Sequence, residues 1–470
     1  MSARTGTAER TGAPPGPRDP GAGSQPRHAR ERAGPAGADT WILRAAVAAL
    51  VLGVAVFGSL VAVRTPVYSP VDEGAHFEYV QYIAQHGGLP VLGRHYAPLA
   101  DLLIDPTFST RHYGTDPEKM GIVGLAYEDF QPPLYYALAV PAYELSGNLH
   151  TKVVVLRFFD LLLLAASVLL AARLSRKVLK ERWLVGFTAG LLVLALPGVV
   201  VRAVTLSNTA LTILVTIAGV TELWVAWESD QPSRLALAGG LLGLGLLTSL
   251  FSVVLVPVYL LVALGVVART RSRRDLGWAG AGAGIALLLV GPWLAFNLVE
   301  YHALTAASLA RSEQLATVNP HHLHYGPGLV VNEAGSWLVS PVLPQEWSLF
   351  GHPVLNWVTG VLAVAVIPLA LLLGLSLGRR VVSSGSWMLA LPWVLNVLLC
   401  AGITYFGQWQ TVLARYTYPT LPLLAVFGAV GAVGAVRDRR VVTAALAGLT
   451  VGVLALWIGL VPQIHAPMTG

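Results

Sequence analysis

The sequence predicts an all-α integral membrane protein, because apolar segments close to twenty residues long recur along most of the chain. A helix needs about 20 apolar residues to cross a bilayer. The chain is 55% hydrophobic and only 12% charged, whereas soluble domains carry about 25% charged residues. Its net charge of +6 comes from basic residues in short loops. That pattern is a signal of membrane topology, and not the footprint of a nucleic-acid-binding protein.

The first forty residues differ from the rest of the chain. They are rich in Gly, Pro, Ala and Arg and almost without large apolar side chains. Such a segment cannot bury a core, so 1–40 is predicted to be a disordered cytoplasmic tail. The apolar run that follows, 41–63, is too long for a signal peptide and lacks a convincing cleavage site. It is predicted to be an uncleaved first span.

About eleven transmembrane helices are predicted from apolar length and from the basic loops between the segments. They are 41–63, 153–172, 183–201, 208–227, 234–249, 251–268, 276–298, 354–377, 386–405, 416–436 and 441–462. With this count, four strongly basic loops lie on the cytoplasmic side with the N-terminal tail, as the positive-inside rule requires. The count holds only if 132–147 does not cross the membrane. That segment has the length of a re-entrant or interfacial helix.

These spans divide the chain into four regions of a multi-pass protein of the cell membrane. After the tail, 41–298 forms a transmembrane module with a large extracytoplasmic first loop at 64–152, which carries juxtamembrane helices. A second extracytoplasmic loop occupies 299–353, and 354–470 holds the C-terminal transmembrane helices. Long loops are uncommon unless they are functional or disordered. Because the first loop also concentrates acidic residues, we expect the chemistry there.

An amphipathic helix is predicted at 69–90, directly after the first span. Ser69 has the character of an N-cap and Pro70 that of a first helical residue. Apolar residues follow at helical spacing, and the glycine pair at 87–88 ends the helix. We expect this helix to lie against the outer membrane surface.

The start of that helix carries an unusual group of polar residues, Asp72, Glu73 and His76. Asp72 and His76 are four positions apart, so they share one helix face. One interpretation is structural, because Ser-x-x-Asp is a capping box and acids favour a first helical turn. The functional interpretation is favoured by the second acid and the histidine, which exceed what a cap needs.

A second acidic stretch lies at 127–147. Glu128 and Asp129 precede a proline pair, and Tyr135 belongs to an aromatic group suited to the membrane interface. A solvated acidic turn before an interfacial helix is one interpretation. The other is that this stretch brings a second carboxylate near the first.

The order of these features resembles the GT-C superfamily of polytopic glycosyltransferases. In sequence order they are a span, P-x-D-E-x-x-H, a long outer loop, an acid before Q-P-P-L-Y-Y, then a helix and an arginine-bearing span. The chain is most similar to the protein-mannosyltransferase and aminoarabinose-transferase branch, and to actinobacterial multi-pass relatives of unknown function. The resemblance covers about 41–210 and touches 291–306 and 410–422.

This resemblance implies an inverting transfer of a sugar from a polyprenyl-phosphate donor to an extracytoplasmic acceptor, which would be a cell-envelope glycan, lipid or protein. Asp72, at the D-E position, would be the general base, with Glu73 as its neighbour and possible substitute. Glu128 or Asp129 would be the second acid, which positions the acceptor or a metal. The resemblance fixes no cofactor; a divalent cation is the one candidate.

The donor phosphate needs a cationic partner. The aminoarabinose branch has a basic residue beside the proline pair, where this chain has Gln131. Arginine suits a phosphate by its bidentate geometry, and Arg415, Arg157 and Arg202 all lie at predicted outer ends of spans. The alternative for each is snorkelling at the interface. The residues predicted to bind substrate are His76, Gln131, Tyr135, Arg157 and Arg415.

Two other functions remain open from the sequence. The first is a multi-pass transporter or flippase of a lipid-linked or small substrate, and the second is a non-catalytic membrane scaffold. Ion-coupled transport places ionisable groups near the middle of the membrane, where the predicted spans have almost none. Two acids that converge beside a groove would favour the enzyme, whereas a polar cavity across the bilayer would favour the transporter.

Overall fold

The computed structural model describes residues 38–65, 67, 72–92, 128–178, 190, 196–228, 231–307, 309–310, 326–339, 367–375, 385–406, 414–435, 451–453 and 457–458. Ile42–Gly470 forms one compact unit, separate from Met1–Trp41. All regular secondary structure in the described ranges is helical. The predicted all-α membrane fold is confirmed, while the tail 1–37 lies outside the described residues.

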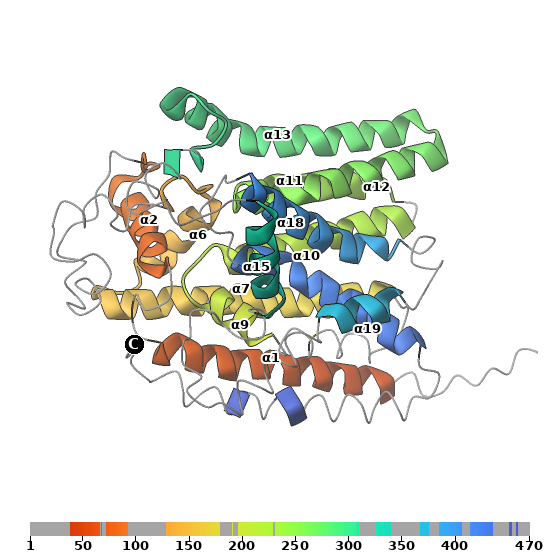
Figure 1. The fold of residues 1–470 in the computed structure, drawn as a ribbon, viewed down its shortest axis with the longest axis horizontal. Coiled ribbons are helices and arrows are strands. Elements are labelled where there is room, and N and C mark those ends of the chain that lie inside the picture. The colour runs from red at the N-terminus through yellow and green to blue at the C-terminus, as the bar shows by residue number, and fades with distance from the viewer. Residues whose placement is uncertain are drawn as a thin grey trace, which may run out of the picture. The chain divides into compact units, whose positions relative to one another are not determined.

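The helices follow the predicted order along the chain (Figure 1). The first half contains α1 (Ala38–Arg64), α2 (Glu73–His86), α6 (Leu134–Tyr143), α7 (Leu149–Val178), α9 (Pro197–Val204), α10 (Thr209–Glu228) and α11 (Arg234–Leu246). The second half contains η2 (Leu250–Val254), α12 (Leu255–Thr270), α13 (Arg273–Tyr301), α15 (Pro327–Val339), α18 (Trp387–Tyr405), η4 (Ala414–Thr420) and α19 (Leu421–Ala435).

Five helical segments in the described ranges are long and apolar enough to cross a membrane: Leu149–Val178, Thr209–Glu228, Leu250–Thr270, Arg273–Tyr301 and Trp387–Tyr405. Each coincides with a predicted span. Val51–Arg64 and α11 are shorter apolar helices. Three predicted spans lie mostly outside the described residues: 183–201, 354–377 and 441–462. The total of eleven transmembrane helices therefore stays a prediction.

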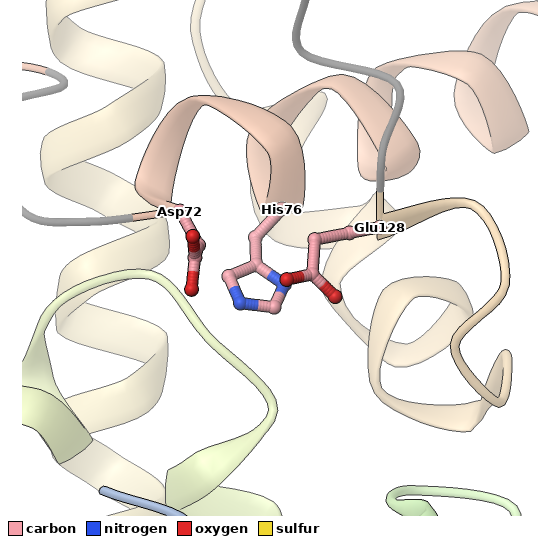
Figure 2. A group of neighbouring side chains, drawn as sticks. All are labelled: Asp72, His76 and Glu128. Carbon is pink, nitrogen blue, oxygen red and sulfur yellow. The ribbon is translucent and has the colours of Figure 1, made fainter. Parts of the chain in front are cut away.

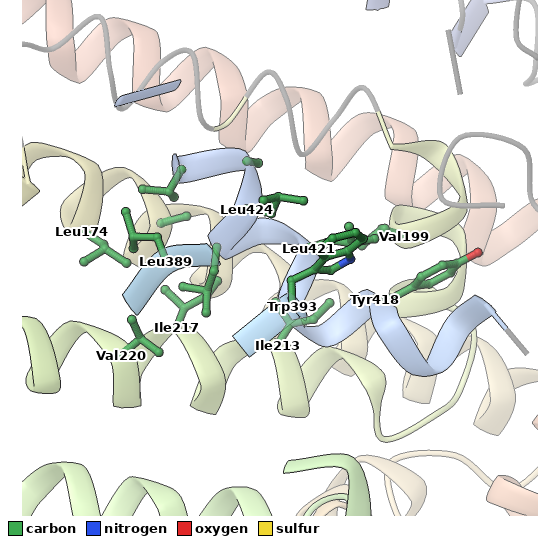
Figure 3. Packing of buried hydrophobic residues seen from close by; sticks show 14 of the residues in the cluster. Leu174, Val199, Ile213, Ile217, Val220, Leu389, Trp393, Tyr418, Leu421 and Leu424 are labelled. Atoms are coloured by element: carbon green, nitrogen blue, oxygen red, sulfur yellow. The ribbon is translucent and has the colours of Figure 1, made fainter. Parts of the chain in front are cut away.

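Helix α10 lies at the centre of the main hydrophobic core. The most apolar stretch of this helix is 83% buried. The helix contacts α7, α11, α12, α18, α19 and η4. Figure 3 shows how side chains from these helices interlock: Leu174 of α7, Ile213, Ile217 and Val220 of α10, Leu389 and Trp393 of α18, and Leu421 and Leu424 of α19. Because α10 is packed on so many sides, residues at its two ends have fixed positions.

A second core joins α2 and α6 to the first part of α7. Phe77 and Val80 of the predicted apolar stripe are buried in it. The stripe of α2 therefore packs against protein. Helix α6 has ten residues, which gives a length of about 15 Å. That is about half the hydrocarbon thickness, so a helix of this size cannot cross alone.

The start of α2 differs from the prediction. The helix begins at Glu73 and not at Pro70, and Asp72 occupies the N-cap position with a left-handed φ of 69°. Its side chain accepts no capping hydrogen bond from α2, so Asp72 precedes this helix and does not belong to its first turn as the capping box would require. Ser69 and Pro70 lie outside the described residues. The end of the helix is as predicted, with Gly87 as a left-handed C-cap whose N–H donates to the Ile83 carbonyl at 2.8 Å.

Candidate active site

A polar pocket lies where the start of α2 meets the N-terminal end of α10 and the short 3-10 helix η4. It contains about 430 Å³ of empty space, including its open side. Its lining residues are Asp72, His76, Glu128, Gln131, Arg202, Asn208, Thr209, Thr212, Ser249, Phe251, Arg415, Tyr416 and Pro419. Segments far apart in the sequence thus bring two acids, a histidine and two arginines to one place.

Asp72 is held between two arginines. Its carboxylate forms an ion pair with Arg415, and Oδ2 lies 3.7 Å from Nη2 of Arg202. The three side chains are 5–10% exposed. The left-handed turn at Asp72 explains the separation of the two consecutive acids, because it directs Asp72 into the pocket just before the helix begins at Glu73.

His76 lies one helical turn further along α2 and is buried. Its Nδ1 is 2.9 Å from the Tyr136 hydroxyl, and its Nε2 is 3.4 Å from Nη2 of Arg202. Burial, and then the charge of Arg202, lowers the pKa of His76 to about 3. The imidazole is therefore neutral near pH 7. A guanidinium can only donate, so Nε2 accepts and Nδ1 carries the proton towards Tyr136.

Glu128 faces the pocket from the turn before α6. Its Oε2 accepts a hydrogen bond of 2.8 Å from Nε2 of Gln131. Burial, and then the negative charge of Asp72, raises the pKa of Glu128 to about 8, against the opposing effects of Gln131 and the two arginines. This carboxyl is therefore largely protonated at pH 7, and a small change in its surroundings would ionise it.

Asp72, His76 and Glu128 point towards one another, as Figure 2 shows. Each offers a ligand atom within 4.8 Å of the other two. Two carboxylates and a neutral imidazole are a donor set that suits zinc or manganese. The residues present therefore fit a divalent cation, although Asp72 also pairs with Arg415, so a cation and this guanidinium would compete for one carboxylate.

Glu73 and Arg157 do not line the pocket, contrary to the sequence prediction. Arg157 donates to both carboxylate oxygens of Glu73, from Nε at 2.7 Å and from Nη2 at 2.6 Å. Its Nη1 donates to the carbonyls of Ala62 at 2.9 Å and Thr65 at 2.6 Å. Both side chains of the pair are fully buried. This pair joins α1, α2 and α7, and its position is structural.

Tyr135 and Asp129 are also outside the pocket lining. The Tyr135 hydroxyl donates to the Asp160 carboxylate at 2.9 Å, and the backbone N–H of Ser207 donates to the same carboxylate at 3.3 Å. Tyr135 thus links α6 to α7 through a hydrogen bond in the protein interior, and does not lie at the membrane interface as predicted. Asp129 is buried, and of the two neighbouring acids it is Glu128 that reaches the pocket.

The arginines do not snorkel to the interface. Arg157, Arg202 and Arg415 are all largely buried and paired with carboxylates. Arg202, which the sequence offered with the other two as a candidate partner of the donor phosphate, lines the pocket. Its signal in the sequence was its place at the predicted outer end of a span.

The η4 turn that carries Arg415 is held from two sides. Nδ2 of Asn396, on α18, donates to the Tyr416 carbonyl at 2.9 Å. Phe251 of η2 stacks on the Tyr416 ring with centroids 4.5 Å apart. The polar side chains Asn208, Thr209, Thr212 and Ser249 complete the lining. Sequence alone gave no sign of these residues, since small polar groups at helix ends are common.

Comparisons with known proteins bear on the family and the fold of this chain. A family model described as dolichyl-phosphate-mannose-protein mannosyltransferase matches residues 131–296. That region starts at Gln131 in the pocket and ends within α13. No curated protein sequence matches the chain.

Two solved structures are similar in fold. ArnT from Cupriavidus metallidurans, bound to undecaprenyl phosphate, gives a TM-score of 0.52 at 14% identity over 91% of this chain and 74% of that chain. The Archaeoglobus fulgidus oligosaccharyltransferase, in complex with zinc and sulfate, gives 0.50 at 14% identity over 89% of this chain and 54% of that chain. The chain shares the fold of these two structures, as the resemblance found in its sequence predicts.

The buried ion pair between Glu73 and Arg157 predicts how a substitution changes the stability of the protein. Glu73→Gln removes the counter-charge of Arg157, and removing one partner of a buried ion pair costs about 3–5 kcal/mol. We expect the variant to unfold at a clearly lower temperature than the parent when both are purified in detergent.

The matched control for this measurement is Glu222→Gln. Glu222 pairs with Arg234 at 3.3 Å, but the arginine is 43% exposed. Pairs of this kind contribute about 0–1 kcal/mol, so this control should unfold close to the parent. Equal shifts in the two variants would contradict the structural role of the Glu73–Arg157 pair.

Proposed function

We propose that this protein is a membrane glycosyltransferase that moves a sugar from a polyprenyl-phosphate donor to an acceptor hydroxyl outside the cytoplasm. The observation that carries the proposal is the convergence of Asp72 and Glu128 with Arg202 and Arg415 in one pocket. Such a transfer needs a base for the acceptor proton and positive charge for the leaving phosphate. The GT-C fold and the matched mannosyltransferase model support the same chemistry.

The proposed reaction is a single displacement. The acceptor oxygen attacks the anomeric carbon from the side opposite the phosphate. The bond from that carbon to the phosphate oxygen breaks, and its electron pair leaves with the phosphate. The acceptor proton passes to a carboxylate, and the configuration of the sugar inverts.

Asp72 is the proposed base, and the arginines are the proposed phosphate ligands. Arg415 and Arg202 flank the Asp72 carboxylate, and both guanidiniums suit a phosphate by geometry. A donor phosphate would compete with Asp72 for these two groups. Its binding would therefore free the carboxylate to accept the proton at the moment when the donor is in place.

The location of the pocket favours the enzyme over a transporter. The two acids converge at the N-terminal end of α10, while the middle of that helix is buried among apolar side chains. That is the arrangement expected for a reaction at one membrane face. The assignment of this face to the outside, with a cytoplasmic N-terminus, follows from the basic loops.

Asp72→Asn tests the proposed base. Asn tolerates the left-handed backbone at this position as well as Asp does, and comparison at matched expression separates a loss of transfer from any loss of stability caused by removing the ion pair with Arg415. A general base contributes about 10²–10⁴-fold in rate, and transfer should fall by that order. The measurement is the envelope glycan profile of a deletion strain that carries each variant at matched expression. Glu144→Gln, at the exposed end of α6, should restore the parental profile. Parental glycans with Asp72→Asn would exclude Asp72 as the base.

Arg415→Gln and Arg202→Gln test the proposed donor site. A hydrogen bond to a charged group is worth about 1.5–3 kcal/mol, so each variant should bind undecaprenyl phosphate about ten- to a hundredfold more weakly. Binding is measured by native mass spectrometry of the purified protein. Arg234→Gln, on the exposed surface of α11, is the control and should keep the parental affinity. Undiminished binding in both pocket variants would place the donor phosphate elsewhere.

A divalent cation at Asp72, His76 and Glu128 would add positive charge beside the phosphate. We expect purified protein to bind Mn²⁺, as measured by isothermal titration calorimetry. Glu128→Gln should weaken binding by about tenfold or more, because a cation would displace the proton of the Glu128 carboxyl and gain a charged ligand, whereas an amide stays neutral. Glu144→Gln should have no effect. If Mn²⁺ binds both variants equally or the parent not at all, these three residues are not a metal site.

A further inference from the structure

A second polar pocket lies at the other end of α10. Its lining includes Ala226 of α10, Arg269 of α12, and Arg274 and Trp278 of α13, and it contains about 1150 Å³ of empty space, including its open side. Thr209 in the first pocket and Ala226 in this one are separated by about 25 Å along the helix, at 1.5 Å per residue. That distance approaches the thickness of a bilayer's hydrocarbon core, so the two pockets belong to opposite membrane faces.

The surroundings of this pocket are strongly basic. Arg269 and Arg274 line it, and Arg271 and Arg273 are exposed beside them. One acid, Asp275, also contributes to the lining. The pocket therefore has an excess of positive charge that faces solvent.

Arg269 is already oriented. Its Nη2 donates to the Trp227 carbonyl at 3.0 Å, and its guanidinium lies over the Trp227 ring, 3.9 Å from the centroid. A guanidinium that stacks on an aromatic ring by its flat face still has N–H groups at its edge that can donate hydrogen bonds to an anion. Arg274 approaches the same space from α13. Both side chains thus line one pocket, from two neighbouring helices.

Exposed leucines lie on the two helices that supply the arginines of the pocket. Leu264 of α12 and Leu276 of α13 are 66% and 60% exposed, although neither lines the pocket itself. Trp278 and Trp227 supply the aromatic groups that favour the headgroup level of a bilayer. A cationic pocket between helices that also expose leucines and carry tryptophans has the features that suit a phosphate headgroup with acyl chains.

We propose that this pocket binds the headgroup of an anionic phospholipid, in the leaflet opposite the candidate active site. Basic pockets between transmembrane helices on the cytoplasmic side bind acidic lipid headgroups in this way. Arg274 and Arg269 would contact the phosphate, and the acyl chains would lie along Leu264 and Leu276. The site is independent of the proposed reaction, because it shares no residue with the first pocket.

The test is a lipid titration of the full-length protein in detergent, followed by native mass spectrometry. The probes are dioctanoyl phosphatidylglycerol, dioctanoyl phosphatidylcholine and glycerol phosphate, the last being a headgroup without chains. We expect the anionic lipid to bind about tenfold more tightly than the zwitterionic one, since a charge-assisted contact is at stake. Equal binding of the two lipids, or binding of glycerol phosphate as tight as that of phosphatidylglycerol, would overturn the proposal.

Arg274→Gln and Arg273→Gln distinguish a pocket from a diffuse basic surface. The two residues are adjacent and both exposed, but only Arg274 lines the pocket. Arg274→Gln should weaken phosphatidylglycerol binding by about tenfold, Arg273→Gln by less than about threefold, and Arg274→Lys should restore part of the loss. Equal losses in the two glutamine variants would mean a general electrostatic attraction and would refute the site. Unchanged thermal unfolding of Arg274→Gln confirms that a loss of binding is local.

Discussion

The buried ion pair between Glu73 and Arg157 is the constraint on which the candidate site depends. Two charges without access to water are stable only when each finds full hydrogen bonding. Arg157 meets that condition with both oxygens of Glu73 and the carbonyls of Ala62 and Thr65. The end of α1, the start of α2 and the body of α7 therefore cannot move independently. The first residue of the pocket, Asp72, is the direct chain neighbour of this pair.

Two consecutive acids consequently have different surroundings. The left-handed turn at Asp72 sends one carboxylate into a pocket with two arginines, while Glu73 enters the protein interior. A motif with two adjacent acids is ambiguous from sequence, because either one can be the reactive group. The structure removes much of that ambiguity through burial. Glu73 is paired with Arg157 in the interior, whereas Asp72 lines the polar pocket.

The predictable part of the molecule is the part that local sequence determines. Apolar length identified the helices now described as α7, α10, α12, α13 and α18, because the bilayer imposes a length on each span. The acids, His76 and Arg415 stood out by residue type. Partners could not be predicted, since Tyr135 meets Asp160 and Arg157 meets Glu73 only after packing. The start of α2 was wrong for a related reason, because capping statistics describe average helices and not a turn fixed by Arg415.

The charges of the pocket match those of the proposed substrate. With the pKa of Glu128 near 8, this group is mostly neutral at pH 7, so Asp72 and two arginines leave about one positive charge. A sugar-phosphate diester of a polyprenol carries one negative charge, and it would make the pocket neutral. Transfer leaves a phosphate monoester with up to two negative charges at pH 7, while the proton from the acceptor neutralises Asp72. The total charge therefore stays constant during the step, and the arginines gain a stronger partner as Asp72 loses its charge.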